Sequence, residues 1–123
     1  MRIGTGSPFE TEFAYSRALV RGGWCFVSGT TGYDYATMTM PDTALEQAQN
    51  AFATIGRTLA EAGFAMADIV RVQYTITDAS LRGEIAPALR EALGEVRPAA
   101  TMIVAGLNEP EMKVEIEVTA FRG

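Results

Sequence analysis

The 123-residue sequence contains no histidine, one lysine and one cysteine, and these absences exclude several kinds of chemistry. Without histidine, the chain cannot build a Ser-His-Asp or Cys-His catalytic site from its own residues. The single cysteine, Cys25, forms no internal disulfide, and a zinc site is not expected. Lys113 is the only lysine, which leaves little basis for Schiff-base chemistry. We therefore predict no bound metal.

The sequence also lacks the features of nucleotide-binding, nucleic-acid-binding and membrane proteins. Neither G-x-G-x-x-G nor G-x-x-x-x-G-K-[ST] occurs, so nothing predicts a loop for nucleotide phosphates. The formal net charge is −5, whereas nucleic-acid binding normally needs a basic face. No apolar run reaches the roughly 20 residues that span a bilayer, and the N-terminus lacks the apolar core of a signal peptide. We predict a single cytoplasmic domain over residues 1–123 with neither nucleic acid nor membrane as a partner.

Hydrophobic periodicity predicts five strands and two helices. Two β-prone runs flank Gly22-Gly23 and indicate a hairpin. Thr43 and Glu46 have capping-box spacing, and the apolar residues that follow recur at helical steps as far as Gly63, a natural C′ residue. Residues 69–77, 101–105 and 112–121 are expected strands, and the last of these alternates cleanly. A second helix ends near Gly94, and Pro87 favours a start near Ala86.

The expected order is ββαβαββ, an α+β domain with two helices on one face of a mixed sheet. The uncovered face would mix polar and aromatic side chains. In a domain of this size, such a face is often covered by self-association. The loop over residues 30–42 is long for a small domain, and long loops are often functional.

Several short segments, in this order and spacing, resemble the RidA/YjgF family over nearly the whole chain. They are Val27-Ser28-Gly29-Thr30 after the hairpin, Ala62-Gly63 at a helix end, Asp68-Ile69-Val70-Arg71-Val72, Arg97-Pro98-Ala99, and Val114-Glu115-Ile116-Glu117-Val118-Thr119-Ala120. The resemblance implies a chorismate-mutase-like fold, a homotrimer and three clefts between subunits. It also implies hydrolysis of enamines and imines to a 2-oxo acid and ammonia, without a metal or cofactor.

One position departs from the family pattern and weakens the expectation of standard imine deaminase activity. Active deaminases carry an arginine in a P-A-R-S stretch that grips the substrate carboxylate, and here Pro98-Ala99 is followed by Ala100. Alanine cannot make the bidentate contact of a guanidinium. Losing such a pair costs about 1.5–3 kcal/mol. The chain therefore resembles a divergent branch that lacks the usual catalytic arginine.

Glu115 is the candidate catalytic residue. The resemblance makes it an acid or base that holds a water. Glu117 lies two residues on, so the two carboxylates share a strand face about 7 Å apart, which tends to raise one pKa. The alternative is a solvated face or an ion pair with Arg71.

The candidate substrate-binding residues lie in three parts of the chain. The turn Ser28-Gly29-Thr30 offers hydroxyls and backbone N–H groups for an anion, and the alternative is a simple turn. Tyr15 matches a family position at the cleft edge, with a core anchor as the alternative. Tyr33, in Tyr33-Asp34-Tyr35, belongs to a lid over the substrate or to loop packing.

Arg97 and Thr101 complete the candidate set near the missing arginine. Arg97 reaches the substrate anion from a different backbone position or caps the end of the second helix, where a cation suits the helix dipole. Thr101 is a cleft candidate beside it.

Two functions remain open on this sequence. The first is a RidA-like deaminase or hydrolase that acts on a small molecule bearing a carboxylate, other than the standard 2-imino acids. The second is a non-catalytic trimer that binds a metabolite or another protein. Nucleic-acid cleavage fits neither the charge nor the absent histidines.

Overall fold

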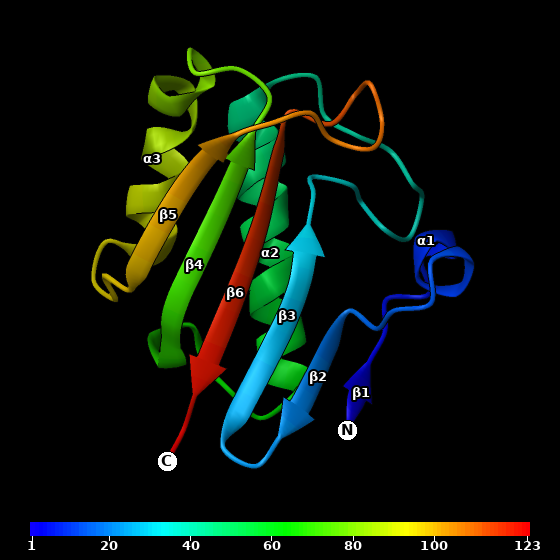
Figure 1. Ribbon diagram of the computed structural model, residues 1–123, viewed down its shortest axis with the longest axis vertical. Helices are drawn as coiled ribbons and strands as arrows, with labels where there is room; N and C mark the ends of the chain where they lie inside the picture. The colour runs from blue at the N-terminus through cyan, green and yellow to red at the C-terminus, as the bar shows by residue number, and fades with distance from the viewer.

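The computed structural model describes all residues, 1–123, and consists of one six-stranded sheet with two long helices on one face (Figure 1). The strands are β1 (Arg2–Ile3), β2 (Ala18–Arg21), β3 (Trp24–Thr30), β4 (Ile69–Ile76), β5 (Ala99–Val104) and β6 (Val114–Phe121). The helices are α1 (Pro8–Glu12), α2 (Ala44–Glu61), the 3-10 turn η1 (Met66–Asp68) and α3 (Leu81–Leu93). The sheet order is β1-β2-β3-β6-β4-β5, and only β4 and β5 pair in parallel. The predicted α+β fold with a mixed sheet is confirmed.

The N-terminal region holds two elements that the sequence did not predict. The two-residue strand β1 pairs with β2, and the five-residue helix α1 begins at Pro8 behind the capping residue Ser7. Both are too short for a hydrophobic period to appear. The predicted hairpin of β2 and β3 is confirmed, with Gly22 at a φ of +55° in the turn.

The long helix α2 forms where the sequence predicted it. The Thr43 hydroxyl accepts a hydrogen bond from the Glu46 N–H at 3.1 Å, and Gly63 ends the helix at a φ of +85°. Ala48, Ile55 and Leu59 are fully buried against the sheet. The apolar stripe therefore decides which face of α2 covers the strands.

The second long helix begins earlier than predicted. It starts at Leu81, not near Ala86, and continues through Pro87. Proline at this position removes the hydrogen bond to the carbonyl of Gly83, four residues back. Gly83 and Pro87 are both exposed, so water can hydrogen-bond to the Gly83 carbonyl in place of the missing N–H. The buried Ile85 packs the first turn of α3 against the core.

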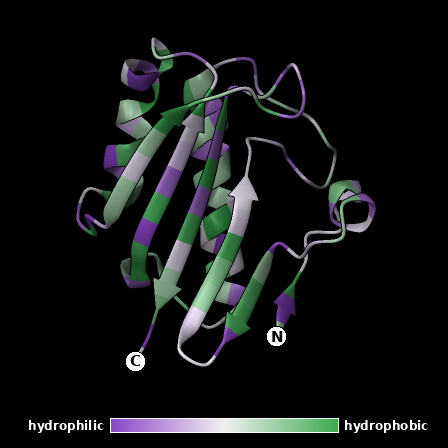
Figure 2. Ribbon diagram, viewed as in Figure 1, coloured by the Kyte–Doolittle hydropathy of each residue, from purple (hydrophilic) through white to green (hydrophobic).

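The central strand β6 divides the sheet into a covered and an open face, and its alternating bands are visible in Figure 2. Val114, Ile116, Val118 and Ala120 point to the helices and are at most 1% exposed. The residues between them point to the open face. That face also carries an aromatic cluster of Trp24, Phe26 and Phe121, which are 39–46% exposed.

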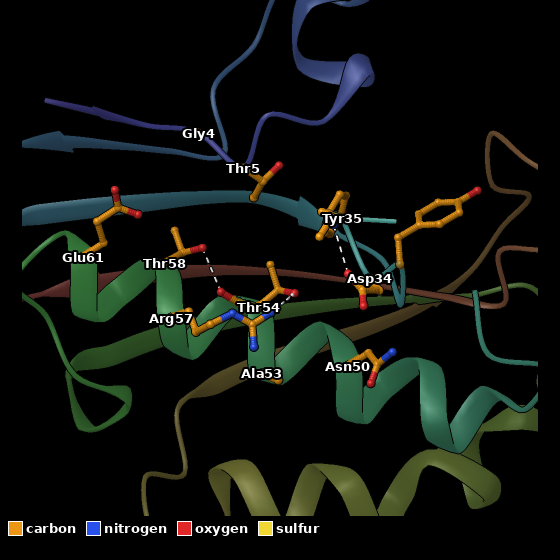
Figure 3. Close-up of a pocket in the computed structure, with 12 residues that line it drawn as sticks. Gly4, Thr5, Asp34, Tyr35, Asn50, Ala53, Thr54, Arg57, Thr58 and Glu61 are labelled. Carbon is orange, nitrogen blue, oxygen red and sulfur yellow. Dashed lines mark hydrogen bonds between the residues drawn. The ribbon is translucent and has the colours of Figure 1, made fainter. Parts of the chain in front are cut away.

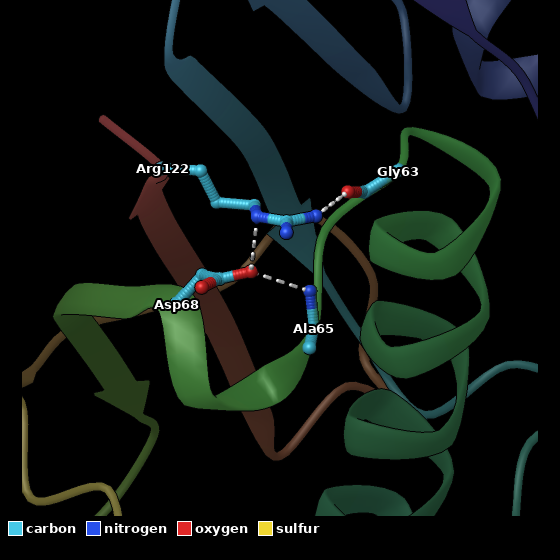
Figure 4. Close-up of polar contacts among 4 residues, drawn as sticks. All are labelled: Gly63, Ala65, Asp68 and Arg122. Carbon is cyan, nitrogen blue, oxygen red and sulfur yellow. Dashed lines mark hydrogen bonds and ion pairs between the residues drawn. The ribbon is translucent and has the colours of Figure 1, made fainter.

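The C-terminal end of β6 is tied to the connection between α2 and β4 (Figure 4). Arg122 donates to the Gly63 carbonyl at 2.6 Å and lies 3.7 Å from the Asp68 carboxylate. Asp68 also accepts from the Ala65 N–H at 2.8 Å. No helix in the structure combines the length and apolar character needed to cross a membrane.

Candidate functional site

An open cavity of about 730 Å³ lies where β3 ends and β6 begins, bordered by α1 and by the loops before α2 and β6. We call it the Glu115 cavity. Its lining is Phe9, Phe13, Tyr15, Ser28, Gly29, Thr31, Tyr35, Asn108, Glu109, Met112, Glu115 and Glu117. It therefore brings together four of the candidate residues, Tyr15, Ser28, Gly29 and Glu115, from segments far apart in the sequence.

The floor of the cavity is a bulge in β3. The pairing register between β3 and β6 shifts between Val27 and Thr30, so Ser28 and Gly29 leave the regular ladder. A Cβ atom on Gly29 would lie 2.6 Å from the Glu115 carboxyl carbon. Only glycine leaves room for the carboxyl group to lie against the backbone here.

Glu115 is half-buried on the open face, and its pKa is raised above the ordinary value of a glutamate. Burial is the main cause of the raised pKa, the Arg17 guanidinium opposes it, and the Glu117 carboxylate adds to it. A carboxyl group in a cavity with a pKa raised by burial is a candidate for taking up and returning protons in a reaction. The alternative ion pair with Arg71 is not formed, because the Arg71 guanidinium donates to the Thr101 hydroxyl at 2.9 Å.

Arg17 lies behind the wall of this cavity, and sequence reasoning missed it. Its side chain is 0% exposed. It donates to the Gly29 carbonyl at 2.8 Å and to the Tyr35 hydroxyl at 3.1 Å. The sequence pattern that could have revealed it is an arginine next to the apolar run of β2, a place where a charge is expensive to bury.

Buried amide contacts hold the two loops around the cavity. The Gln47 side chain, 1% exposed, donates to the carbonyls of Pro41 and Glu111 and accepts from the Lys113 N–H at 2.9 Å. The loop before α2 and the loop before β6 are thereby fixed to the same point on α2. Gly32 packs directly on Gln47, where a Cβ would lie 2.5 Å from its Cα atom.

Two candidates on the β3 side lie away from the Glu115 cavity. Thr30 is 0% exposed, and its hydroxyl donates to the Ser28 carbonyl at 2.8 Å, so it supports the bulge. Tyr33 is 6% exposed and donates to the Glu111 carboxylate at 2.6 Å. Burial raises the pKa of Tyr33 above its ordinary value, and the Glu111 contact adds to this.

Tyr33 belongs instead to a second, polar cavity of about 570 Å³ between α2 and the N-terminal segment (Figure 3). Figure 3 shows one face of α2, with Asn50, Thr54, Arg57, Thr58 and Glu61, opposite Thr5 and Tyr35. Tyr35 lines both cavities.

Arg97 and Thr101 lie near the edge strand β5, two strands away from β6 in the sheet order. Arg97 is exposed, has a φ of +51° and donates to the Gly94 carbonyl at the end of α3. Thr101 faces the open side and pairs with Gln73. Ala100 is exposed at the same edge. One chain alone does not bring these residues into the Glu115 cavity.

The cavity contains no nucleophile paired with a base and no metal-binding cluster. No group of three or more His, Cys, Asp or Glu side chains in the structure is arranged to hold a metal ion. Cys25 is 0% exposed, and burial raises the pKa of its thiol, which disfavours the reactive thiolate. The Glu115 carboxyl group in this cavity lies beside hydroxyl groups and aromatic rings.

Comparison with known proteins matches residues 5–122 to the model of a family described as Endoribonuclease L-PSP. The chain is 29% identical over 123 residues to the uncharacterized protein SCO2049 of Streptomyces coelicolor, covering 99% of this chain and 92% of that protein. Its fold is similar to that of Rv2704 from Mycobacterium tuberculosis, a member of the YjgF/YER057c/UK114 family. For that pair the TM-score is 0.90 and the identity 34%, covering 99% of this chain and 98% of the other. RidA from the Antarctic bacterium Psychrobacter sp. PAMC 21119 matches with a TM-score of 0.83 and 27% identity over 88% of each chain.

Proposed function

The chain belongs to the Endoribonuclease L-PSP (RidA/YjgF) family, and from this premise we propose that it is a small-molecule deaminase or hydrolase acting on C–N bonds. The observation that carries the proposal is the Glu115 carboxyl group, half-buried against Gly29 in a cavity that also presents Tyr15 and Ser28. Glu115 is the proposed acid/base residue. Tyr15, Ser28 and Gly29 are the proposed binding residues of the same chain.

In this proposal, Glu115 acts on a water molecule that adds to the carbon of a C=N bond. The carboxylate accepts a proton from the water as the new C–O bond forms, and it then returns this proton to the imine nitrogen, which gives a carbinolamine. Glu115 next moves the hydroxyl proton of the carbinolamine to the nitrogen, the C–N bond breaks, and ammonia leaves as the C=O bond forms. An imine and a water molecule thus become an oxo compound and ammonia, with no metal or cofactor required. The ionised carboxylate is needed for the first step, so activity should fall as pH drops through the raised pKa of Glu115.

We propose that the working form is a homotrimer with clefts between subunits. The exposed aromatic cluster of Trp24, Phe26 and Phe121 on the open face favours self-association. A second chain would also let Arg97 and Thr101 on one subunit approach the Glu115 cavity of another. Light scattering at about three times the 13.2 kDa of one chain is expected, and a monomer would contradict this part of the proposal.

The proposed substrate is a small molecule with a carboxylate, other than the short 2-imino acids. No lysine or arginine lines the Glu115 cavity, and Ala100 stands where the family pattern has arginine. A missing guanidinium–carboxylate pair weakens binding by about one to two orders of magnitude. The net charge of −5 and the absence of histidine give no support for RNA as the substrate.

The test is ammonia release from a panel of freshly generated enamines and imines. We expect turnover of at least one member, and release from 2-aminoacrylate about 10- to 100-fold slower than for a relative that carries the arginine. Equal rates on 2-aminoacrylate would contradict the argument from Ala100.

The alternative is a trimer that binds a metabolite or protein without catalysis, and the lack of a basic residue in the Glu115 cavity favours it. Saturable binding of a panel member, with no ammonia or oxo product at any pH, would establish this alternative in place of the enzyme.

A further inference from the structure

Arg17 is a charged side chain in a place where charges are rarely found. It is the largest fully buried side chain in the structure, with 0% exposure. Its guanidinium makes two hydrogen bonds, to Gly29 and Tyr35, and its Nε has no partner. Because an unpaired buried charge is strongly unfavourable, a nearby negative charge or a functional reason is needed to explain its retention.

No carboxylate forms a direct ion pair with Arg17. The one ion pair within 4.0 Å in the structure joins Arg122 and Asp68, at the far end of β6. Tyrosine rings take up the space around the guanidinium instead: the rings of Tyr15 and Tyr35 are each centred 5.5 Å from its carbon. Such cation–π contacts offset part of the burial penalty but leave the net charge in place.

The contacts of Arg17 converge on the residues that surround Glu115. Its NH2 group donates to the carbonyl of Gly29, the residue against which the Glu115 carboxyl group lies. Its NH1 group donates to the hydroxyl of Tyr35. That hydroxyl also accepts from the Thr31 N–H at 3.3 Å. Gly29, Thr31, Tyr15 and Tyr35 all line the Glu115 cavity, so the guanidinium lies directly behind its wall.

We propose that Arg17 is the positioning residue of this site: it fixes the Gly29 bulge and Tyr35 around Glu115, and its buried positive charge keeps the Glu115 carboxylate ionised for reaction with water. The inference rests on the proposed function of Glu115. The positive charge of Arg17 thus lies behind the wall of the Glu115 cavity. There it acts on Glu115 and does not touch the substrate.

The charges around Glu115 agree with this role. Burial raises the pKa of Glu115, Arg17 lowers it, and Glu117 raises it. The other titratable groups that line the cavity are Tyr15, Tyr35 and Glu109, none of which carries a positive charge. Arg17 is therefore the single group near the cavity that favours the ionised form of Glu115.

The first test is the pKa of Glu115, measured from the side-chain carboxyl ¹³C shift during a pH titration of the full-length protein. In Arg17→Met, which removes the charge but keeps a long apolar side chain, we expect this pKa to rise, because the charge that lowers it is gone. Arg17→Lys keeps the charge and should hold the pKa close to that of the parent. The matched control is Arg122→Met, which removes the same charge at the other end of β6 and should leave the Glu115 titration unchanged.

A second measurement avoids any loss of folding in the Arg17 variants. In the unmodified protein, the Nε and Cζ shifts of Arg17 should change with the same midpoint as the Glu115 carboxyl. In Glu115→Gln that change should disappear. If Arg17 shows no response at the Glu115 midpoint, or if the folded Arg17→Met leaves the Glu115 pKa unmoved, the inference is overturned.

The outcome is distinguishable from that of the proposed function. A Glu115 pKa that rises in Arg17→Met supports the positioning role even if no panel substrate is turned over, in which case only the enzymatic proposal fails. If ammonia release falls off at the same acidic pH in the parent and in Arg17→Met, the enzymatic proposal stands. Arg17 then has no part in the mechanism.

Discussion

The side chains on the two faces of β6 differ in burial and in chemical character, although they alternate along one strand. The residues toward the helices, Val114, Ile116, Val118 and Ala120, are closely packed and at most 1% exposed. Of the residues between them, Glu115 and Glu117 line the Glu115 cavity, and the pKa of Glu115 is raised mainly by burial. The covered face is arranged for stability, while the open face keeps a carboxyl group in an environment that disfavours its charge. Substitutions on the two faces should therefore separate stability from activity.

The largest effect is expected for Glu115→Gln. The amide is nearly isosteric but cannot accept a proton, so turnover of any active panel substrate should fall by about 10²- to 10⁴-fold. Stability at neutral pH should be kept or increased, because the native state no longer contains a partly buried carboxylate. Steady-state kinetics and thermal unfolding measure the two quantities. Glu117→Gln, on the same face but exposed, is the matched control and should change activity far less.

Ile116→Ala tests the covered face one residue away. The side chain is fully buried beneath α2, so its truncation should lower the free energy of unfolding by about 2–5 kcal/mol. The rate per folded molecule should remain near that of the parent. Urea unfolding gives the first quantity and kinetics at low temperature the second. If Ile116→Ala were stable but turned over substrate slowly, this would contradict the assignment of stability to the covered face and activity to the open face.

Gly29→Ala sharpens the comparison at the bulge. Its methyl group would lie 2.6 Å from the Glu115 carboxyl carbon, which forces this carboxyl group to move. Because small displacements of a reacting group have large kinetic consequences, we expect turnover to fall by about 10- to 100-fold. Gly56→Ala in α2 is the control, because the nearest atom to its added Cβ would be the Met66 sulfur, 3.9 Å away. It should stabilise the helix by about 1 kcal/mol without affecting turnover.

The smallest effect is expected at the exposed edge of the open face. Thr101→Val removes the hydroxyl that accepts from Arg71, and the free energy of unfolding should change by no more than about 0.5 kcal/mol. A clear loss of turnover in this variant would show that Thr101 reaches an active cleft, which requires a neighbouring subunit.

Long periodic segments of this fold could be predicted from the sequence, and short irregular ones could not. The α2 stripe and the alternation of β6 repeat often enough to fix both element and buried face. Strand β1 and helix α1 span two and five residues, too few for any period. The start of α3 was misplaced because exposure of Pro87, which makes it tolerable, depends on tertiary packing.

The candidate site shows the same limit. Tyr15 and Glu115 were predicted from the resemblance to a family, and Ser28 and Gly29 also from the hydroxyl and backbone N–H groups of their turn. All four line one cavity. Arg17 was not, because a buried arginine follows no periodic rule, and its hydrogen-bond acceptors are a backbone carbonyl and a distant tyrosine. Arg97 and Thr101 lie outside this cavity in the single chain. Local sequence does not encode whether a neighbouring subunit brings them to it.

The central claim is that the fold holds the Glu115 carboxyl group partly out of water in the cavity that we propose as the active site. Its most direct test is the ¹³C-detected titration of Glu115 in the unmodified protein. The account predicts a midpoint above the ordinary value of a glutamate. Because the native state then binds the proton more tightly than the unfolded chain, stability relative to Glu115→Gln should decrease as pH rises through that window. A midpoint at or below the ordinary value would mean that Glu115 is solvated, and would contradict the claim.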